Sequence, residues 1–149
     1  MKKKILYLTF NETVIMDIKW ILEDLGLNLK IEAIQTLPQL ADTLLEEKER
    51  IILIITDTFL PAVKDLAPIG KPEIGTLDGF QAGFAILEHF LRQKDSSYKN
   101  IPVLILTAKV LTNKEKELMQ KLKVEGYIEL FKPVWRKKFK KFITRLSLK

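Results

Sequence analysis

The chain has 149 residues, no cysteine and a formal net charge of +6 at pH 7, with 47% hydrophobic and 30% charged residues. This length suits one domain, which we place at residues 1–149, and the absence of cysteine excludes disulfides and thiolate metal sites. No apolar stretch approaches a membrane span, and the start "MKKKILYLTFNET" lacks the small-residue cleavage site of a signal peptide. We therefore expect a cytoplasmic protein.

Strand and helix patterns alternate along the chain. Continuous or alternating aliphatic runs predict strands at 4–10, 29–34, 51–56, 101–108 and 127–131. Apolar residues at helical spacing predict five helices. The first follows Asn11, the second has Pro38 in its first turn, and the third runs from about Phe80 to Lys94. The fourth opens with Thr112, and the fifth covers Trp135 to Leu146. The strands and helices thus form five consecutive units.

Five strand–helix units predict an α/β fold with a parallel sheet covered on both faces. A flavodoxin-like (βα)5 three-layer sandwich, with a parallel five-stranded sheet in the order 2-1-3-4-5, fits best. The strand at 29–34 is the most polar of the five, which is typical of an edge strand.

Polar residues follow several of the predicted strands. Asp57 comes directly after the aliphatic run "IILIIT", Thr9 and Phe10 close the first strand, and Thr107 and Lys132 follow the fourth and fifth strands. In doubly wound folds ligands bind beyond the carboxyl ends of the strands, near the point where the strand order reverses. We expect a site at this edge of the sheet.

Three motifs at these strand ends, "DTFLP", "ILTA" and "FKP", occur in the order found in bacterial response regulators. With them the chain resembles a receiver domain over nearly its whole length. The resemblance implies that Asp57 accepts a phosphoryl group from a histidine kinase, that Thr107 and Lys132 contact that group, and that a cis peptide bond precedes Pro133. A carboxylate can act as a nucleophile toward phosphorus, and a hydroxyl and an ammonium group suit the charge of the transferred group.

The sequence departs from the receiver pattern at the metal site. Thr9 and Phe10 stand where receivers carry two acids that help to bind Mg²⁺. Asp57, together with Glu12 as a possible substitute, is the remaining candidate for a metal ligand. We expect no resident cofactor, little affinity for Mg²⁺ and slow phosphorylation, with an Asp57–Lys132 ion pair in place of the metal.

A second departure is an insertion at 62–82, after the third strand. Long loops inside compact domains are uncommon and are often functional or disordered. Its prolines and glycines favour a structured excursion at the rim of the site. In an alternative reading, Asp78-Gly79 is the usual turn of the family and the third helix starts earlier.

The C-terminal segment is strongly basic. We expect its helix to bury one apolar stripe and to expose one basic face; the stripe comprises Trp135, Phe139, Phe142 and Leu146, and the face comprises Arg136, Lys137, Lys140 and Lys141. A solvated helix face explains such a charge run better than sequence-specific nucleic-acid or membrane binding does.

Taken together, these features predict a stand-alone receiver-like signalling domain and not an enzyme. It would act through a histidine kinase or another signalling protein, or through a homodimer formed by the fourth helix, the fifth strand and the fifth helix. Two alternatives remain open: an active phosphoacceptor with a non-standard metal shell, and a flavodoxin-like enzyme that binds a small molecule. The sequence contains no glycine-rich phosphate-binding loop that would support the enzyme alternative.

Overall fold

A parallel five-stranded sheet forms the centre of the computed structural model, which describes residues 3–47 and 50–146. The strand order is β2-β1-β3-β6-β7, so the predicted order of the five strands is confirmed. The strands are β1 (Lys4–Leu8), β2 (Lys30–Ile34), β3 (Ile51–Thr56), β6 (Val103–Thr107) and β7 (Gly126–Glu129). All neighbouring pairs run parallel, which brings their carboxyl ends to one edge of the sheet.

The burial of each strand explains its place in the sheet. Every side chain of β1 and β6 is buried, and β3 is buried except for one partly exposed isoleucine. Strands that are apolar on both sides need a helix layer on each face. By contrast, β2 begins with an exposed lysine and has two partly exposed residues at its centre, and it lies at the edge as predicted.

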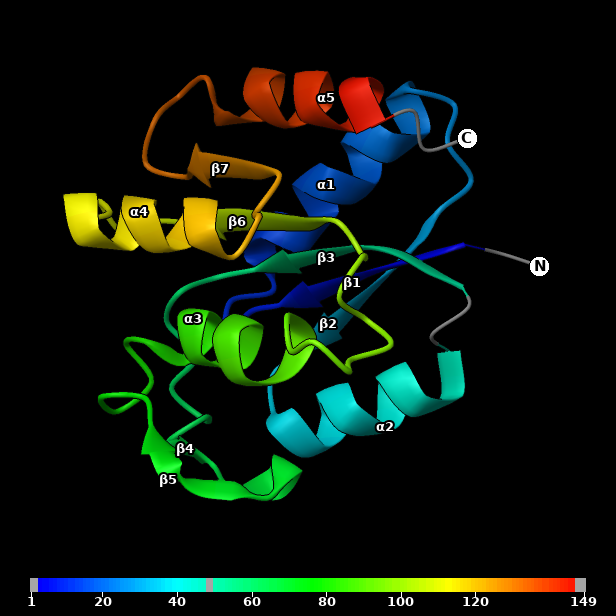
Figure 1. Ribbon diagram of the computed structural model, residues 1–149. Helices are drawn as coiled ribbons and strands as arrows, with labels where there is room; N and C mark the ends of the chain where they lie inside the picture. The colour runs from blue at the N-terminus through cyan, green and yellow to red at the C-terminus, as the bar shows by residue number, and fades with distance from the viewer. Residues whose placement is uncertain (1–2, 48–49, 147–149) are drawn as a thin grey trace.

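Helices cover both faces of the sheet (Figure 1). One face carries α1 (Thr13–Asp24) and α5 (Trp135–Leu146), which contact each other. The opposite face carries α2 (Leu37–Glu47) and α3 (Ala82–Ile86), and the chain continues from α3 into a π turn, η2 (Leu87–Leu91). Helix α4 (Asn113–Lys121) contributes flanking apolar residues to the core of that second face. Of the helices in the described ranges, none is both long enough and apolar enough to cross a bilayer.

Local signals at the helix ends agree with the structure. Gly26 follows α1 with a φ of 71°, the left-handed conformation that glycine adopts without a steric penalty. At the start of α4, the Thr112 hydroxyl accepts a hydrogen bond from the Glu115 N–H group, and the Glu115 carboxylate accepts one from Thr112. The predicted capping box is therefore confirmed.

Helix α5 has the predicted amphipathic character. Its buried residues are Trp135, Phe139, Phe142 and Ile143, whereas Leu146 is only partly buried. All four basic residues expected on the outer face are exposed. Two of them form ion pairs with α1: Arg136 with Asp17 at 3.1 Å and Lys140 with Asp24 at 2.7 Å.

Several expected details differ in the structure. The first strand ends at Leu8, and the hydroxyl of the next residue, Thr9, bonds the backbone of Asn11 in the turn that follows. The third helix begins at Ala82, two residues after the expected start near Phe80, and Asp78 and Gly79 lie with positive φ in a turn just before it, as the alternative expects. The described residues contain no cis peptide bond, so the bond before Pro133 is trans and the cis bond implied by the resemblance is absent.

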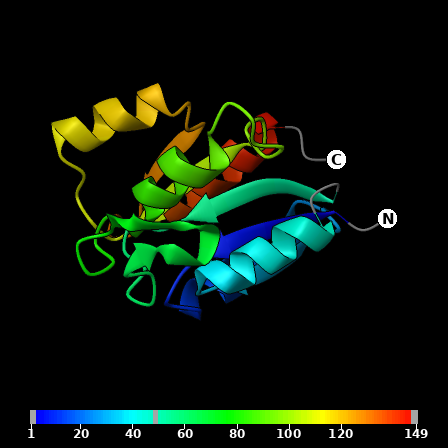
Figure 2. The same ribbon diagram turned by 60° about the horizontal axis from the view of Figure 1, so that its bottom comes forward.

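The insertion at 62–82 forms a small unit of its own. An antiparallel pair, β4 (Asp65–Leu66) and β5 (Lys71–Gly75), flanks a short 3₁₀ turn, η1 (Ala67–Ile69). Figure 2 shows this unit in green beside α2, which η1 contacts.

Hydrogen bonds close the insertion onto the chain that follows β3. The buried Thr76 hydroxyl donates to the carbonyl groups of Val63 and Lys64 and accepts a bond of 3.0 Å from the Gly79 N–H group. The Leu60 N–H group donates to the Gly79 carbonyl at 2.9 Å. Residues 76–80 are thereby held next to the chain just after Asp57.

Gly83 provides a test of this packing. A Cβ atom at Gly83 would lie 2.2 Å from the Asp57 carbonyl oxygen and 3.0 Å from the Thr58 Cα atom. Helix propensity favours alanine over glycine by about 1 kcal/mol, but both contacts are with backbone that cannot rotate away. We therefore expect Gly83→Ala to lower the free energy of unfolding by ~1–3 kcal/mol in urea denaturation.

Gly75→Ala is the matched control, because an added Cβ meets no atom within 4 Å there and φ is not positive. It should change the stability by less than about 0.5 kcal/mol. If Gly83→Ala proved as stable as the wild type, α3 would not be packed directly on the Asp57 peptide.

Candidate functional site

Asp57 is the first residue after β3 and is 7% exposed. Its N–H group donates to the Leu8 carbonyl at 2.9 Å, which fixes the residue at the end of β1 as well. One carboxylate oxygen, Oδ1, accepts three hydrogen bonds: from the Thr58 N–H at 2.6 Å, the Phe59 N–H at 3.2 Å and the Thr107 hydroxyl at 2.8 Å. The structure thus brings Asp57 and Thr107, from neighbouring strands, into direct contact.

Thr107 is the last residue of β6 and also bonds in two other directions. Its oxygen accepts from the Lys109 N–H group at 3.2 Å and lies 3.2 Å from the Thr58 hydroxyl. Because the Thr107 proton is directed to Asp57, Thr58 is the donor in this last contact. The three groups make a closed network at the strand ends.

A cavity of about 300 Å³ opens next to this network. Tyr7, Thr9 and Phe10 from the end of β1, together with Leu130, line it along with Asp57. The pocket is therefore at the edge of the sheet where the strand order predicted a site.

Three aromatic rings border the cavity. The ring centroids of Phe10 and Phe59 are 5.1 Å apart in an edge-to-face arrangement, and those of Phe59 and Phe80 are 4.7 Å apart and stacked. Phe80 belongs to the insertion, and sequence reasoning assigned it to a helix and not to the site. The only signal available was the placement of the insertion directly after the strand that carries Asp57.

The predicted ion pair between Asp57 and Lys132 is wrong. The Lys132 ammonium group lies 2.9 Å from the Glu129 carboxylate and is half exposed. This pairing holds the pKa of Glu129 below its ordinary value. The Leu130 N–H group donates to the Thr107 carbonyl at 2.8 Å, so Leu130 and not Lys132 enters the cavity.

Lys132 is displaced because the chain turns before it. Its N–H group donates to the Glu129 carbonyl at 3.2 Å, which closes a turn. Lys132 thus comes two residues after Leu130, the residue that bonds the Thr107 backbone. Receivers usually carry an aromatic residue three positions before the lysine, and here Tyr127 stands three positions before Leu130. Leu130 is thus the residue of this segment that lies beside Thr107 and lines the cavity.

The residues around the cavity do not form a magnesium site. Asp57 is the one carboxylate that lines it, and no group of three metal-ligating side chains occurs in the described ranges. Glu12, the possible substitute, is exposed and accepts a bond of 3.5 Å from Gln35. Mg²⁺ prefers an octahedral shell of hard oxygen ligands, which one carboxylate among aromatic rings does not supply.

Burial shapes the protonation of the site. It raises the pKa of Asp57 above 3.8, against the opposing effect of bonds from Thr107, Phe59 and Thr58. Burial also raises the pKa of Tyr7, and the negative charge of Asp57 raises it further. The Tyr7 phenol therefore stays protonated, and its hydroxyl is buried without a hydrogen-bond partner in the described structure.

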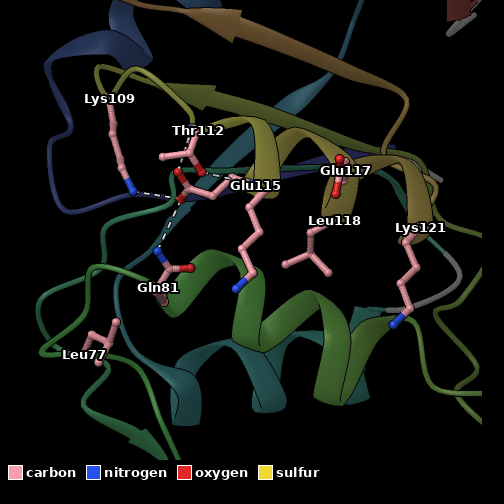
Figure 3. A pocket seen from close by; sticks show the side chains of 9 residues that line it. Leu77, Gln81, Lys109, Thr112, Glu115, Glu117, Leu118 and Lys121 are labelled. Atoms are coloured by element: carbon pink, nitrogen blue, oxygen red, sulfur yellow. Dashed lines mark hydrogen bonds and ion pairs between the residues drawn. The ribbon is translucent and has the colours of Figure 1, made fainter.

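A second hollow of about 680 Å³ lies between the start of α3 and α4 (Figure 3). The Glu115 carboxylate bonds the Lys109 ammonium group at 2.8 Å and the Gln81 amide at 3.2 Å (Figure 3). Burial acts to raise the pKa of Glu115, but the bonds from Lys109, Thr112 and Gln81 together hold it below its ordinary value. Lys109 lines both hollows and so connects them.

Comparison with known proteins gives matches among solved structures alone. No protein-family model matches the chain, and no curated protein sequence matches it. A two-component response regulator from Legionella pneumophila is 26% identical, with 98% of each chain covered and a TM-score of 0.65.

Two further solved structures support the same fold. The signal receiver domain of a DNA binding response regulator from Colwellia psychrerythraea 34H is 19% identical, with a TM-score of 0.69 and coverage of 99% of this chain and 100% of that chain. The HemR receiver domain from Leptospira biflexa, solved without phosphorylation, is 23% identical, with a TM-score of 0.65 and coverage of 99% and 97%. The resemblance thus extends over nearly the whole chain.

The raised pKa of Asp57 predicts a pH-dependent effect on stability. Below the unfolded value of 3.8 the carboxyl group is protonated in both states; as the pH rises through the higher folded pKa, ionisation of the buried group removes stability. Asp57→Asn keeps an oxygen acceptor and stays neutral. At about pH 8 we expect this variant to unfold at higher urea concentration than the wild type. Its free energy of unfolding should be larger by ~1.4 kcal/mol for each unit that separates the folded and unfolded pKa values of Asp57.

The difference should shrink when the same titration is carried out near about pH 4.5. Asp78→Asn removes an exposed carboxylate instead and should leave the stability close to that of the wild type at both pH values. A wild-type protein more stable than Asp57→Asn at the higher pH would contradict the expected direction.

Proposed function

We propose that this chain, which has the fold of response regulator receiver domains, is a receiver-like signalling domain that acts through contacts with partner proteins and without rapid Mg²⁺-dependent phosphorylation. The observation that carries this proposal is the composition of the cavity beside Asp57. It retains the carboxylate and the hydroxyl of Thr107 but has threonine, phenylalanine and leucine where receivers place two acids and a lysine.

The charges around Asp57 support the proposal. Phosphoryl transfer needs a metal ion and cationic groups that neutralise the charge of the transferred group. Lys132 is paired with Glu129, and Lys109, the other lysine near the site, is paired with Glu115. Among residues 3–47 and 50–146, Asp57 therefore has neither acids that share a metal ion with it nor an unpaired cation beside it.

The proposed partners are a histidine kinase or another signalling protein. We place the contact on the face formed by α4, β7 and α5. The segment that connects β7 to α5 carries two exposed apolar residues, Phe131 and Val134, at 48% and 47% exposure. A second copy of the chain on the same face is the homodimeric version of this contact. In this proposal residues 1–149 act as one domain, the insertion included, and the domain is not an enzyme.

The basic α5 is proposed to have no sequence-specific nucleic-acid partner. Arg136 and Lys140 are engaged with acids of α1, and the aromatic side chains of the helix are buried instead of being free to stack on bases. Any binding to DNA would come from the remaining exposed lysines and would weaken steeply with salt.

Mg²⁺ titration and phosphoryl labelling test the proposal. In the wild-type protein we expect little heat from Mg²⁺ in calorimetry and little acyl phosphate at Asp57 after incubation with acetyl phosphate, followed by intact-mass measurement. The triple variant Thr9→Asp, Phe10→Asp, Leu130→Lys restores both acids and places a lysine in the cavity. Its affinity for Mg²⁺ should rise at least about tenfold, and labelling should become metal-dependent.

Lys132→Leu is the matched control, because it removes the lysine suggested by sequence but not one that lines the cavity. It should leave both measurements unchanged, and Asp57→Asn in the triple background should abolish labelling. Tight Mg²⁺ binding and fast labelling of the wild type would overturn the proposal in favour of an active phosphoacceptor with a non-standard metal shell.

A further inference from the structure

Two polar groups that line the cavity beside Asp57 have bonding capacity that no protein group uses in the described ranges. All three hydrogen bonds to the Asp57 carboxylate end on Oδ1, and no protein donor reaches Oδ2 in the described ranges. The Tyr7 hydroxyl, on a side chain with no exposed surface, makes no hydrogen bond of good geometry among these residues, although the Thr9 side chain lies near enough to act on the pKa of Tyr7. Both residues line the same cavity. The carboxylate oxygen and the phenol oxygen can therefore both accept hydrogen bonds from a ligand in this cavity.

A ligand that binds in this cavity should carry positive charge. Asp57 has no cationic partner in the described structure, since the nearby ammonium groups of Lys109 and Lys132 are bound to Glu115 and Glu129. A buried carboxylate without a counter-ion is costly unless another group compensates its charge. The N–H groups of Thr58 and Phe59 already serve Oδ1 and do not reduce the demand at Oδ2.

The remaining wall of the cavity suits an organic group. Phe10, Phe59 and Phe80 border it, and the faces of aromatic rings attract cations. The volume of about 300 Å³ is at the lower end of the range of small-molecule sites. Leu130 and Val14 add apolar surface that a hydrated metal ion could not use.

We propose that this cavity binds a small organic cation, an ammonium group attached to an apolar or aromatic body. The ammonium group donates hydrogen bonds to Asp57 Oδ2 and to the Tyr7 hydroxyl oxygen, and the body lies against the phenylalanine rings. An anion would meet the charge of Asp57 directly, and a neutral ligand would leave that charge uncompensated.

This inference concerns the site of the proposed function and rests on one part of it, namely that Asp57 does not hold Mg²⁺ or a phosphoryl group in normal operation. It adds an input: the ligand, and not phosphorylation, would be the signal that the domain receives. Binding can be measured on unlabelled protein without metal, so it is tested separately from phosphorylation.

Calorimetric titration with three ligands of one shape tests the charge requirement. Phenethylammonium, phenethyl alcohol and phenylacetate share a phenyl ring and a two-carbon linkage or its acid analogue, and differ in charge. We expect saturable one-to-one binding of the ammonium ligand, at least about tenfold weaker binding of the alcohol and weaker binding still of the anion. Equal binding of alcohol and ammonium would overturn the proposal, as would the absence of saturable binding by the ammonium ligand.

Variants locate the ligand within the protein. Asp57→Asn should weaken ammonium binding at least about tenfold, and Tyr7→Phe should weaken it by a smaller factor of about three to ten. Asp78→Asn makes the same chemical change at a carboxylate that is 88% exposed outside the cavity, and should leave the affinity unchanged. An effect of Asp78→Asn as large as that of Asp57→Asn would indicate attraction to the surface and would overturn the assignment to this cavity.

The two proposals can fail independently. Ammonium binding with fast Mg²⁺-dependent labelling of Asp57 would contradict the proposed function and leave the cation site intact. Absent ammonium binding together with absent labelling would overturn the cation site alone. Displacement of the ammonium ligand by millimolar Mg²⁺, but not by an equal ionic strength of NaCl, would show that the cavity also binds a metal ion and would contradict the proposed function alone.

Discussion

A single carboxylate oxygen holds the strand ends together. Oδ1 of Asp57 joins the chain after β3 to the end of β6 through the Thr107 hydroxyl, and it organises the backbone of the next two residues. The carbonyl group of the same residue lies so close to Gly83 that α3 can begin there only with glycine. The position of α3, and with it the return of the insertion to the sheet, therefore depends on the geometry at Asp57.

The same network continues away from the cavity. Thr107 accepts from the Lys109 backbone, the Lys109 ammonium group bonds Glu115, and Glu115 caps α4 and also bonds Gln81 next to α3. Contacts of this kind transmit a change only where an element has two arrangements. Helix α4 is suited to that role, because a hollow of about 680 Å³ separates its Leu118 side from the start of α3 (Figure 3). Occupation of the cavity would thus act on the face proposed to contact partners.

Periodicity in the sequence was sufficient for the sheet and for part of the site. Aliphatic runs identified the buried strands, and their carboxyl ends placed Asp57 and Thr107 together, because parallel strands share one edge. The position of Lys132 could not be read in this way, since a backbone bond between Leu130 and Thr107 and a competing carboxylate three residues earlier decide it. The stacking of Phe80 on Phe59 depends on the path of a 21-residue excursion, residues 62–82, for which no local pattern exists.

The retention of a charge at Asp57 is informative because the fold does not require it. An asparagine in this place could accept the three bonds to Oδ1 through its amide oxygen and would avoid the desolvation that raises the pKa of the carboxyl group. From the direction of this pKa shift, we expect the acid to be less stabilising than asparagine at neutral pH. Natural sequences violate such local rules chiefly at functional sites, where the lost stability is offset by binding or chemistry. The side chains around Asp57 suit metal-assisted phosphorylation poorly, and in the site proposed above the same carboxylate meets the charge of an organic cation instead.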